Sequence, residues 1–306
     1  MYFAHRVFIL LFSVLIFAGC ESDEYGIVPF PENYHQELEA WKADRLESLT
    51  NPTGWMRLSG MYWLEEGESR FGSGNDQDLQ FPEGTIPHHA GTFTYLDGQV
   101  TMKVSDGVAI THNGNPVEEM IIYDSEEDTP HLEHNTLEWL VIERNGLVGI
   151  RLYNKENEKV DEFTGFDTYP VSEEWHIKAR FIPSAENTTI PVINILGQNV
   201  ETPSPGMLEF SVDGEIYSLV TLEGSTRMFV ILGDATNSTE TYQAGRYMYI
   251  DYPEEDSDYT VIDFNKAYNP PCAYSTFTTC QLPPPQNRLD LPITAGEKRP
   301  VGWTGI

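Results

Sequence analysis

Pairs of an aspartate or asparagine followed by glycine recur along this chain between short runs of strand-forming residues. A tight β-hairpin turn needs positive φ angles, which Asn, Asp and Gly adopt most easily, so these pairs are strong hairpin signals. Strands recurring about every 8–12 residues without helical windows between them are typical of sandwiches and barrels. The pairs are 97–98, 106–107, 113–114, 145–146 and 213–214, and the strand-like runs are 91–96, 99–104, 137–143, 149–153, 208–212, 216–222, 228–232 and 245–250.

One segment near the N-terminus has helical periodicity instead. From Pro31 to Leu49, apolar residues recur at near-helical spacing while charged residues occupy the other face. The sequence Asn-Pro-Thr-Gly at 51–54 then ends the helix. We therefore expect a mainly β fold, with two packed β-sandwich or barrel-like domains and one short N-terminal amphipathic helix.

The length of 306 residues suits two modest domains, although one large β-domain would also fit. A gap of weaker strand pattern follows residue 163, and we place a domain boundary near residue 146. The expected organisation is a leader at 1–20, an acidic tether and helix at 21–53, a β-sandwich at 54–145 and a C-terminal β-domain at 146–306.

The first twenty residues have the features of an export signal. Arg6 ends a short basic region, and an apolar core follows from Val7 to Phe17, which is too short to span a bilayer as a helix. Small residues directly precede Cys20, and this pattern resembles a bacterial lipobox. The resemblance implies lipidation of Cys20, membrane attachment through acyl chains and an extracytoplasmic, cell-envelope location. An ordinary secretory signal with an incidental cysteine is the alternative.

The chain is strongly acidic, with 48 Asp and Glu against 18 Lys and Arg and a formal net charge of −30. Such a surface repels nucleic acid, because phosphate contacts require clustered cations, so we expect no nucleic-acid partner. The charge favours solubility and the binding of cationic groups. The sequence contains no Gly-rich phosphate loop, no G-x-S-x-G elbow and no H-E-x-x-H pattern. We assign no cofactor and no metal site.

The segment from residue 263 to 297 is rich in proline and asparagine and cannot form a regular helix or a central strand. We expect a rigid, extended loop that presents polar groups. It contains Cys272 and Cys280, which in an oxidising compartment would form a disulfide. A metal-binding pair or a reduced functional pair are the alternatives.

Polar side chains of this loop and of a preceding strand are the candidate site. Arg246 would bind a carboxylate or phosphate, and Asp263 or Glu297 would act as acid or base, because paired carboxylates serve hydrolases in this way. The structural alternative is an Arg246–Asp263 ion pair, with asparagines capping loop carbonyls. The candidate ligand-binding residues are Arg246, Asp263, Asn265, Tyr268, Asn269, Tyr274 and Asn287.

Three functions fit these features. The first is a lipid-anchored accessory protein of the cell envelope that binds a small polar ligand, because no nucleophile or metal set is recognisable. The second is an extracytoplasmic hydrolase or lyase that uses Asp263 or Glu297 with Arg246. The third is a purely structural or protein–protein interaction role.

The words AYNPPCAYSTFTTCQLPPPQNRLDLPITAGE at 267–297, DATNSTETYQAGRY at 234–247 and VIDFN at 261–265 resemble the domain of unknown function 1684 family, as does WMRLSGMYWLEEGE at 55–68. Gln281 replaces the proline that this family usually has after its second cysteine. The resemblance implies a mainly β fold and no known reaction, so it assigns no catalytic residue.

A second resemblance concerns the N-terminal half. Residues 70–73, 78–81, 87–91 and 113–114 follow the order of landmarks in forkhead-associated sandwiches. Ser73 stands where that family usually has arginine, and histidines follow Pro87 in place of a serine–arginine pair. The resemblance therefore implies a β-sandwich between residues 54 and 145 and does not extend to phosphopeptide binding.

Overall fold

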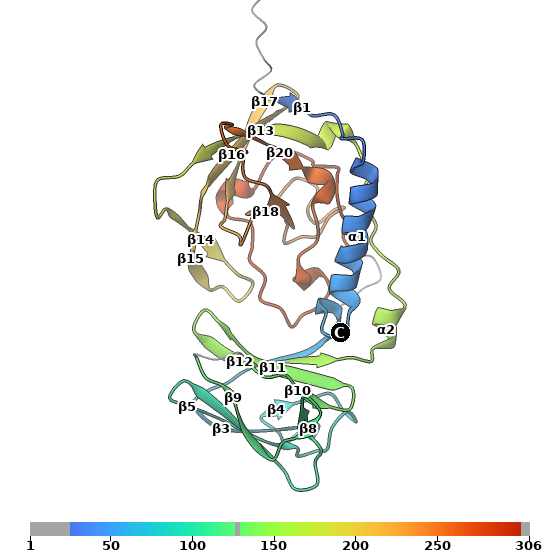
Figure 1. Cartoon of the computed structure of the whole chain (residues 1–306), viewed down its shortest axis with the longest axis vertical. Helices are drawn as coiled ribbons and strands as arrows, with labels where there is room; N and C mark the ends of the chain where they lie inside the picture. The colour runs from blue at the N-terminus through green and yellow to red at the C-terminus, as the bar shows by residue number, and fades with distance from the viewer. Residues whose placement is uncertain (1–24, 126–128, 301–306) are drawn as a thin grey trace, which may run out of the picture.

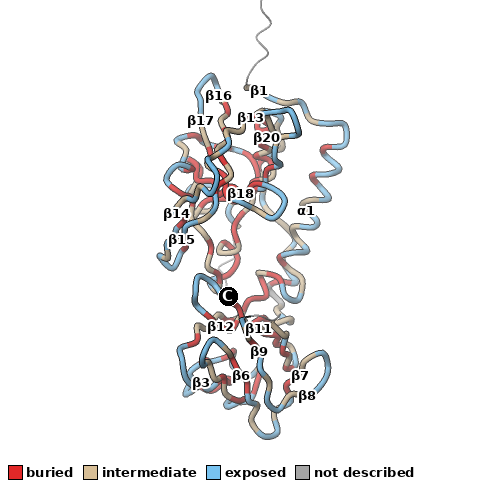
Figure 2. Tube along the Cα trace, turned by 60° about the vertical axis from the view of Figure 1, so that its left-hand side comes forward, coloured by how far each residue is buried: buried red, intermediate tan, exposed pale blue. Residues whose placement is uncertain are grey.

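The structure is a computed structural model that describes residues 25–125 and 129–300. It confirms the expected mainly β fold with sandwich-like sheets and an N-terminal helix. Two β units lie at opposite ends of the long axis of the molecule, and each has its own buried interior (Figures 1 and 2). The leader, the lipobox and Cys20 lie outside the described residues.

The first β unit comprises residues 58–154 and packs two sheets face to face. Phe71, Phe93 and Trp139 are completely buried between them. One sheet has the order β4-β3-β5-β6-β9 and the other β2-β12-β11-β10-β7-β8. The strands are β2 (Leu58–Trp63), β3 (Gly67–Gly72), β4 (Leu79–Gln80), β5 (Gly91–Leu96), β6 (Gln99–Val104), β7 (Thr111–His112), β8 (Asn115–Pro116), β9 (Glu119–Tyr123), β10 (Leu132–His134), β11 (Leu137–Arg144) and β12 (Leu147–Asn154).

Four of the five expected turns are hairpin turns with a left-handed residue at the aspartate or asparagine. These residues are Asp97, Asn113, Asn145 and Asp213, whose φ angles lie between 49° and 53°. The expectation for Asp106-Gly107 was wrong, because this turn does not close a hairpin. It lies on a longer connection from β6 in one sheet to β7 in the other.

The second β unit comprises residues 26–57 and 155–300. Its largest sheet has the order β1-β13-β16-β17, with β20 also paired to β13, and two separate hairpins complete it. Leu208, Phe210 and Phe264 are buried in its core. The strands are β1 (Gly26–Ile27), β13 (His176–Pro183), β14 (Thr189–Ile193), β15 (Asn199–Pro203), β16 (Gly206–Val212), β17 (Glu215–Thr221), β18 (Met228–Leu232), β19 (Arg246–Ile250) and β20 (Tyr259–Asp263).

The N-terminal segment belongs to the second unit although it precedes the first in sequence. Strand β1 pairs with β13, and helix α1 (Tyr34–Thr50) runs along the side of the second unit (Figure 1). Tyr34, Leu38 and Leu49 are the buried residues of this helix. The 3-10 turn η1 (Trp55–Arg57) then leads into β2. The first unit is thus inserted between α1 and the rest of the second unit.

The boundary expected near residue 146 falls within the turn between β11 and β12. These two strands pair over eight residues from Leu137↔Asn154 to Arg144↔Leu147, and both contribute to the first core. A division at this turn would split the longest hairpin of the unit. We therefore propose a boundary after Asn154, before the short helix α2 (Glu158–Asp161).

Candidate functional site

The proline- and asparagine-rich segment is an ordered loop, as expected. It contains three 3-10 turns and no longer helix or strand: η3 (Phe264–Lys266), η4 (Pro271–Ala273) and η5 (Pro285–Asn287). Cys272 and Cys280 form a disulfide, with Cα atoms 6.1 Å apart. The expected cross-link is therefore present.

Arg246 does not face a cavity. It begins β19, pairs with Asp234 at 2.8 Å, and both side chains are completely buried. The guanidinium also donates to the carbonyl oxygens of Ile293, at 2.9 Å, and Ala295. Arg246 thus fixes the end of the C-terminal loop. The structural alternative predicted an ion pair with Asp263, and this was wrong, because the acidic partner of Arg246 is Asp234.

Asp263 closes a second network beside helix α1. Its carboxylate accepts hydrogen bonds from the Tyr34 hydroxyl at 3.0 Å and from the backbone of Asn265 at 3.1 Å. Lys266 lies 3.3 Å away as an ion-pair partner. Burial, together with the nearby Asp263 carboxylate, raises the pKa of Tyr34. Strand β20 ends at Asp263, so this residue caps the turn that contains Asn265.

Glu297 is at the centre of a third network. Its carboxylate accepts from Arg45 at 3.1 Å, from the backbone N–H of Asn269 at 2.7 Å and from the Tyr274 hydroxyl at 3.2 Å. The Arg45 guanidinium lies 4.5 Å from the ring centre of Tyr268. Burial, followed by the charge of Glu297, raises the pKa of Tyr274. This network fastens the C-terminal loop to α1.

The candidate asparagines hold backbone segments together. Asn265 bonds both the N–H and the carbonyl of Ser172 at 3.0 Å. Asn287, which is completely buried, bonds the N–H and carbonyl of Val220 and the carbonyl of Ile231. Asn269 donates to the carbonyl of Lys298 at 2.7 Å. Such bonds satisfy backbone groups that regular strand pairing leaves open and fasten the loop to the segments around it.

The proposed acid, base and arginine therefore belong to three different hydrogen-bond networks. Asp263, Glu297 and Arg246 each have protein partners and none of them lines the cleft described next. Closed networks of this kind favour a structural role, because acid–base catalysis needs its groups within reach of one substrate.

A cleft of about 290 Å³ lies between the two β units. The first unit provides Arg144, Asn145 and Arg151, and the connection between α1 and β2 provides Trp55. In Figure 1 the β11–β12 hairpin lies on the side of the first unit that faces the second. A hydrogen bond of 3.4 Å from Asn145 to Gln198 also joins the two units.

The opposite wall is formed by the β14–β15 hairpin, β19 and the disulfide loop. Val192, Asn194 and Val200 come from the hairpin region and Tyr247 from β19. The loop contributes Pro271 and residues 278–281, including the disulfide-bonded Cys280. The segment expected to carry the site therefore forms one wall of the cleft, but with residues different from the expected ones.

Strand alternation explains why the two arginines reach the cleft. Leu137, Trp139 and Val141 point into the first core, so Arg144 falls on the opposite face of β11. Arg151 has the corresponding position on β12, where it pairs with Leu140. The guanidinium of Arg151 lies 5.0 Å from the ring centre of Trp55. Burial, followed by the charge of Arg151, lowers the pKa of Arg144.

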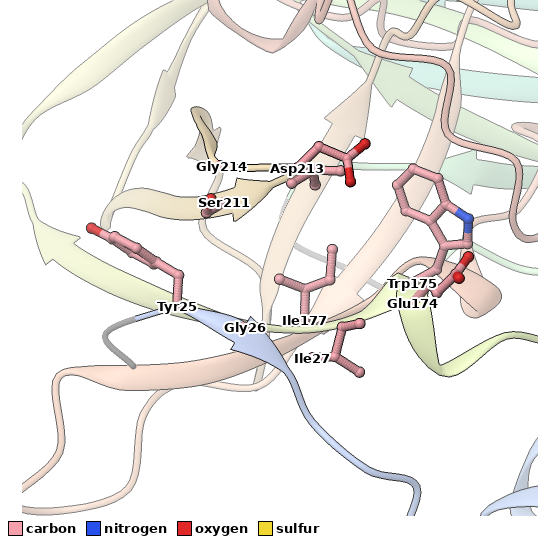
Figure 3. A pocket seen from close by; sticks show the side chains of 10 residues that line it. Tyr25, Gly26, Ile27, Glu174, Trp175, Ile177, Ser211, Asp213 and Gly214 are labelled. Carbon is pink, nitrogen blue, oxygen red and sulfur yellow. The ribbon is translucent and has the colours of Figure 1, made fainter. Parts of the chain in front are cut away.

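A larger cavity of about 610 Å³ lies beside β1 at the far end of the second unit (Figure 3). Its lining includes Tyr25, Trp175 and the carboxylates of Glu174 and Asp213, and it contains no Lys or Arg. In Figure 3 Tyr25 and Trp175 lie on opposite sides of the view, with Ile177 between them. Despite its size, this cavity is formed by the N-terminal strand and a hairpin turn and contains none of the sequence-predicted residues.

The sequence reasoning missed Trp55, Arg144 and Arg151. The alternation of residues 137–144 could have placed Arg144 on the outer face of its strand. It could not have shown that the second unit covers this face, because that packing depends on contacts between distant segments.

Residues 161–298 match a family described as "Protein of unknown function (DUF1684)". The solution NMR structure of an uncharacterized protein of Haloarcula marismortui is 31% identical and matches 47% of this chain and 80% of its own, with a TM-score of 0.39. This chain belongs to the DUF1684 family. The family assignment agrees with the resemblance noted in the C-terminal sequence.

Two forkhead-associated domains are also similar to this DUF1684 protein. One comes from a study of phosphothreonine-dependent interactions and the other is the FhaA domain in a complex. Both are 14% identical with a TM-score of 0.21, and they match 30% of this chain and 92% and 96% of theirs. A search of the curated proteins finds no match.

No helix within 25–125 and 129–300 has the length and apolar character needed to cross a membrane. No group of three or more His, Cys, Asp or Glu side chains gathers there in a metal-binding arrangement.

Proposed function

We propose that this DUF1684 protein is held at the cell envelope by a lipid on Cys20 and binds a small polar ligand in the cleft between its β units. The observation that carries the proposal is the cleft itself, since the β14–β15 hairpin and the disulfide-bonded loop form a wall that presents Asn194, Thr278 and Thr279 opposite Trp55. Small-molecule sites commonly lie between domains and combine apolar walls with a few polar groups.

The location rests on the leader and on the disulfide. The Cys272–Cys280 bond is compatible with an oxidising compartment. Lipidation is tested by expressing the full chain and a Cys20→Ser variant and separating membranes from soluble material. We expect the parent protein in the detergent-soluble membrane fraction and the variant free of the membrane. Equal membrane association of both proteins would contradict the lipid anchor.

We favour binding in the cleft over a hydrolase or lyase reaction that would use Asp263 or Glu297 with Arg246. These three side chains are bonded to separate protein partners, and the lining of the cleft contains no carboxylate. An enzyme that uses carboxylic acids as acid and base needs them at the substrate.

The test is a thermal-shift screen of residues 21–306 against small sugars, amino acids, organic acids and nucleotides. A ligand at about 100 times its Kd stabilises the folded protein by about 2.7 kcal/mol, which raises Tm by about 5–10 °C at about 2–4 °C per kcal/mol. We expect Thr279→Trp to abolish this shift, because the indole would fill the cleft.

Thr276→Trp is the matched control, since Thr276 is an exposed threonine of the same loop that does not line the cleft. We expect this variant to keep the shift. A ligand whose shift survives Thr279→Trp in a folded protein would show that it binds elsewhere.

A further inference from the structure

The cleft differs in charge from the rest of the molecule. The chain contains 48 Asp and Glu against 18 Lys and Arg, yet the cleft lining includes two arginines and no carboxylate. The cavity beside β1 shows the opposite composition, with Glu174 and Asp213 and no Lys or Arg. A cationic lining within such an acidic protein favours an anion in this position over the cationic groups that the net charge alone would attract.

Both arginines have guanidinium N–H groups that are not used in hydrogen bonds within the described part of the chain. Among the described residues, neither Arg144 nor Arg151 forms an ion pair with a carboxylate. The Nε of Arg151 is buried and has no hydrogen-bond partner within the part of the chain that the structure describes. Among residues 25–125 and 129–300, Arg144 donates only to the backbone carbonyl of its neighbour Glu143, at 2.8 Å. Each guanidinium has five N–H donors, so most of them are available to a ligand.

The two like charges also act on each other. Burial, followed by the charge of Arg151, lowers the pKa of Arg144, so the two guanidinium groups repel each other. A bound anion would relieve this repulsion. The ring of Trp55 lies 5.0 Å from the guanidinium of Arg151 and contacts its face. The N–H groups at the edge of the guanidinium therefore remain free to donate to a ligand.

The remaining lining limits the kind of anion. Val192, Val200 and the ring of Tyr247 offer apolar surface, and the volume of about 290 Å³ is at the low end for small-molecule sites. Carboxylates and phosphates match the forked geometry of arginine, whereas larger polymers would not fit. The lining therefore suits a compact molecule with one charged end and one apolar end.

We propose that the cleft binds a small organic anion, a carboxylate or a phosphate monoester with a short apolar portion, through Arg144 and Arg151. This inference rests on the proposed function and names the ligand class of the same site. The net charge of −30 does not oppose it, because exposed charges are screened beyond about 8 Å at physiological salt whereas the arginines would contact the anion directly.

The experiment compares three probes of similar size by calorimetric titration of residues 21–306: benzoate, phenyl phosphate and neutral benzamide. We expect at least one anion to bind about tenfold or more tightly than benzamide, and the stronger of the two identifies the headgroup. Arg144→Gln and Arg151→Gln should each weaken that anion about tenfold to hundredfold, because each removes a charged donor.

Arg227→Gln is the matched control. Arg227 is exposed and lies 5.1 Å from the ring centre of Tyr249, so it copies the arginine–aromatic contact of Arg151 outside the cleft. We expect this variant to bind the anion as the parent does. If Arg151→Gln fails to fold, Arg144→Gln still decides the question, because Arg144 is at the exposed end of its hairpin.

Two results would overturn the inference in different ways. In the first, benzamide binds as tightly as the anions, Thr279→Trp abolishes the binding of all three probes, and the arginine variants have no effect. This result would keep the cleft as a binding site and refute its preference for anions. Failure of all three probes at millimolar concentration, with a folded protein, would refute the anion site. In that second case, a hit of another class in the thermal-shift screen would still support the proposed function.

Discussion

At the scale of single residues, the Arg246–Asp234 ion pair is the interaction of the second unit whose loss we expect to cost the most stability. Both side chains are completely buried at an N–O distance of 2.8 Å. Arg246→Met would leave the Asp234 carboxylate without its cation, and removal of one partner of a buried pair costs about 3–5 kcal/mol. We expect a loss of this size in the free energy of unfolding, measured with urea.

Arg227→Met is the control for this prediction, because Arg227 is exposed and most surface substitutions change stability by about 0.5 kcal/mol or less. A loss below about 1 kcal/mol in Arg246→Met would mean that water replaces the guanidinium beside Asp234.

The sequence predicted the polar character of the C-terminal loop, and capping by its asparagines was the structural alternative to ligand binding. Asn265 and Asn287 do satisfy backbone groups of Ser172 and Val220. The partner of Arg246 could not be predicted, because Asp234 precedes it by twelve residues on the far side of a turn-rich segment. Which of several acidic residues meets a buried arginine depends on tertiary packing, and sequence spacing does not encode it.

At the scale of elements, Arg45 fastens the second half of helix α1 to the second unit, while Tyr34 bonds Asp263 at the start of the helix. Arg45 bonds Glu297 at 3.1 Å and the carbonyl of Asn269 at 2.7 Å, and its side chain is 10% exposed. Arg45→Ala would leave the buried Glu297 carboxylate without a cation. We expect a loss of about 2–4 kcal/mol in the free energy of unfolding.

Lys42→Ala is the matched control on the same helix, because Lys42 pairs only with the exposed Glu39. It should change stability by less than about 1 kcal/mol. Hydrogen exchange would show whether α1 loosens in Arg45→Ala, and unchanged protection of the helix would argue against its role as the fastening residue.

The disulfide loop is the second element with a testable role. Cys272 and Cys280 are separated by eight residues, and the chain-entropy relation gives about 2–3 kcal/mol for a loop of this length. The double substitution to serine should lower stability by this amount. It should also weaken ligand binding, because residues 278–281 form a wall of the cleft.

Calorimetric titration and urea unfolding of the double variant test both effects. A variant that loses stability but binds the ligand with unchanged affinity would show that the loop keeps its position without the cross-link. The Asx-Gly pairs could predict three hairpins of the first unit and the β16–β17 hairpin of the second, whereas the pairing of distant strands could not be predicted. Strand β20 pairs with β13, more than 70 residues away, and local pattern carries no information on such partners.

At the scale of the whole molecule, the first β unit is inserted into the second, so the second unit is built from two separate stretches of the chain. The segment 21–53 was expected to be an acidic tether and helix ahead of both domains, but its part from Gly26 onward belongs to the second unit. Its contacts with Asp263 and Glu297 span more than 200 residues. The second unit can therefore be completed only when the C-terminal loop is present. The cleft between the units follows from the same insertion and for this reason could not be predicted from the sequence.

Buried tyrosines give the whole molecule a predictable response to alkali. Burial raises the pKa of Tyr62 from 10.0 to about 12 and raises the pKa values of Tyr34, Tyr247, Tyr268 and Tyr274 further. The unfolded chain therefore releases these protons first. The stability that they contribute is complete below pH 10 and is lost as the pH rises through the folded-state values, from about 12 for Tyr62 upward.

We expect the free energy of unfolding to fall above pH 10, with a slope of at most about 1.4 kcal/mol per pH unit for each of these groups. Tyr62→Phe should reduce that slope, because one shifted phenol is removed. Circular dichroism and tyrosinate absorbance recorded together check the prediction. Tyrosinate should form in two phases, with the second coinciding with the loss of β structure. A single phase near pH 10 in a protein that remains folded would show that the phenols ionise within the native state and are not protected by burial.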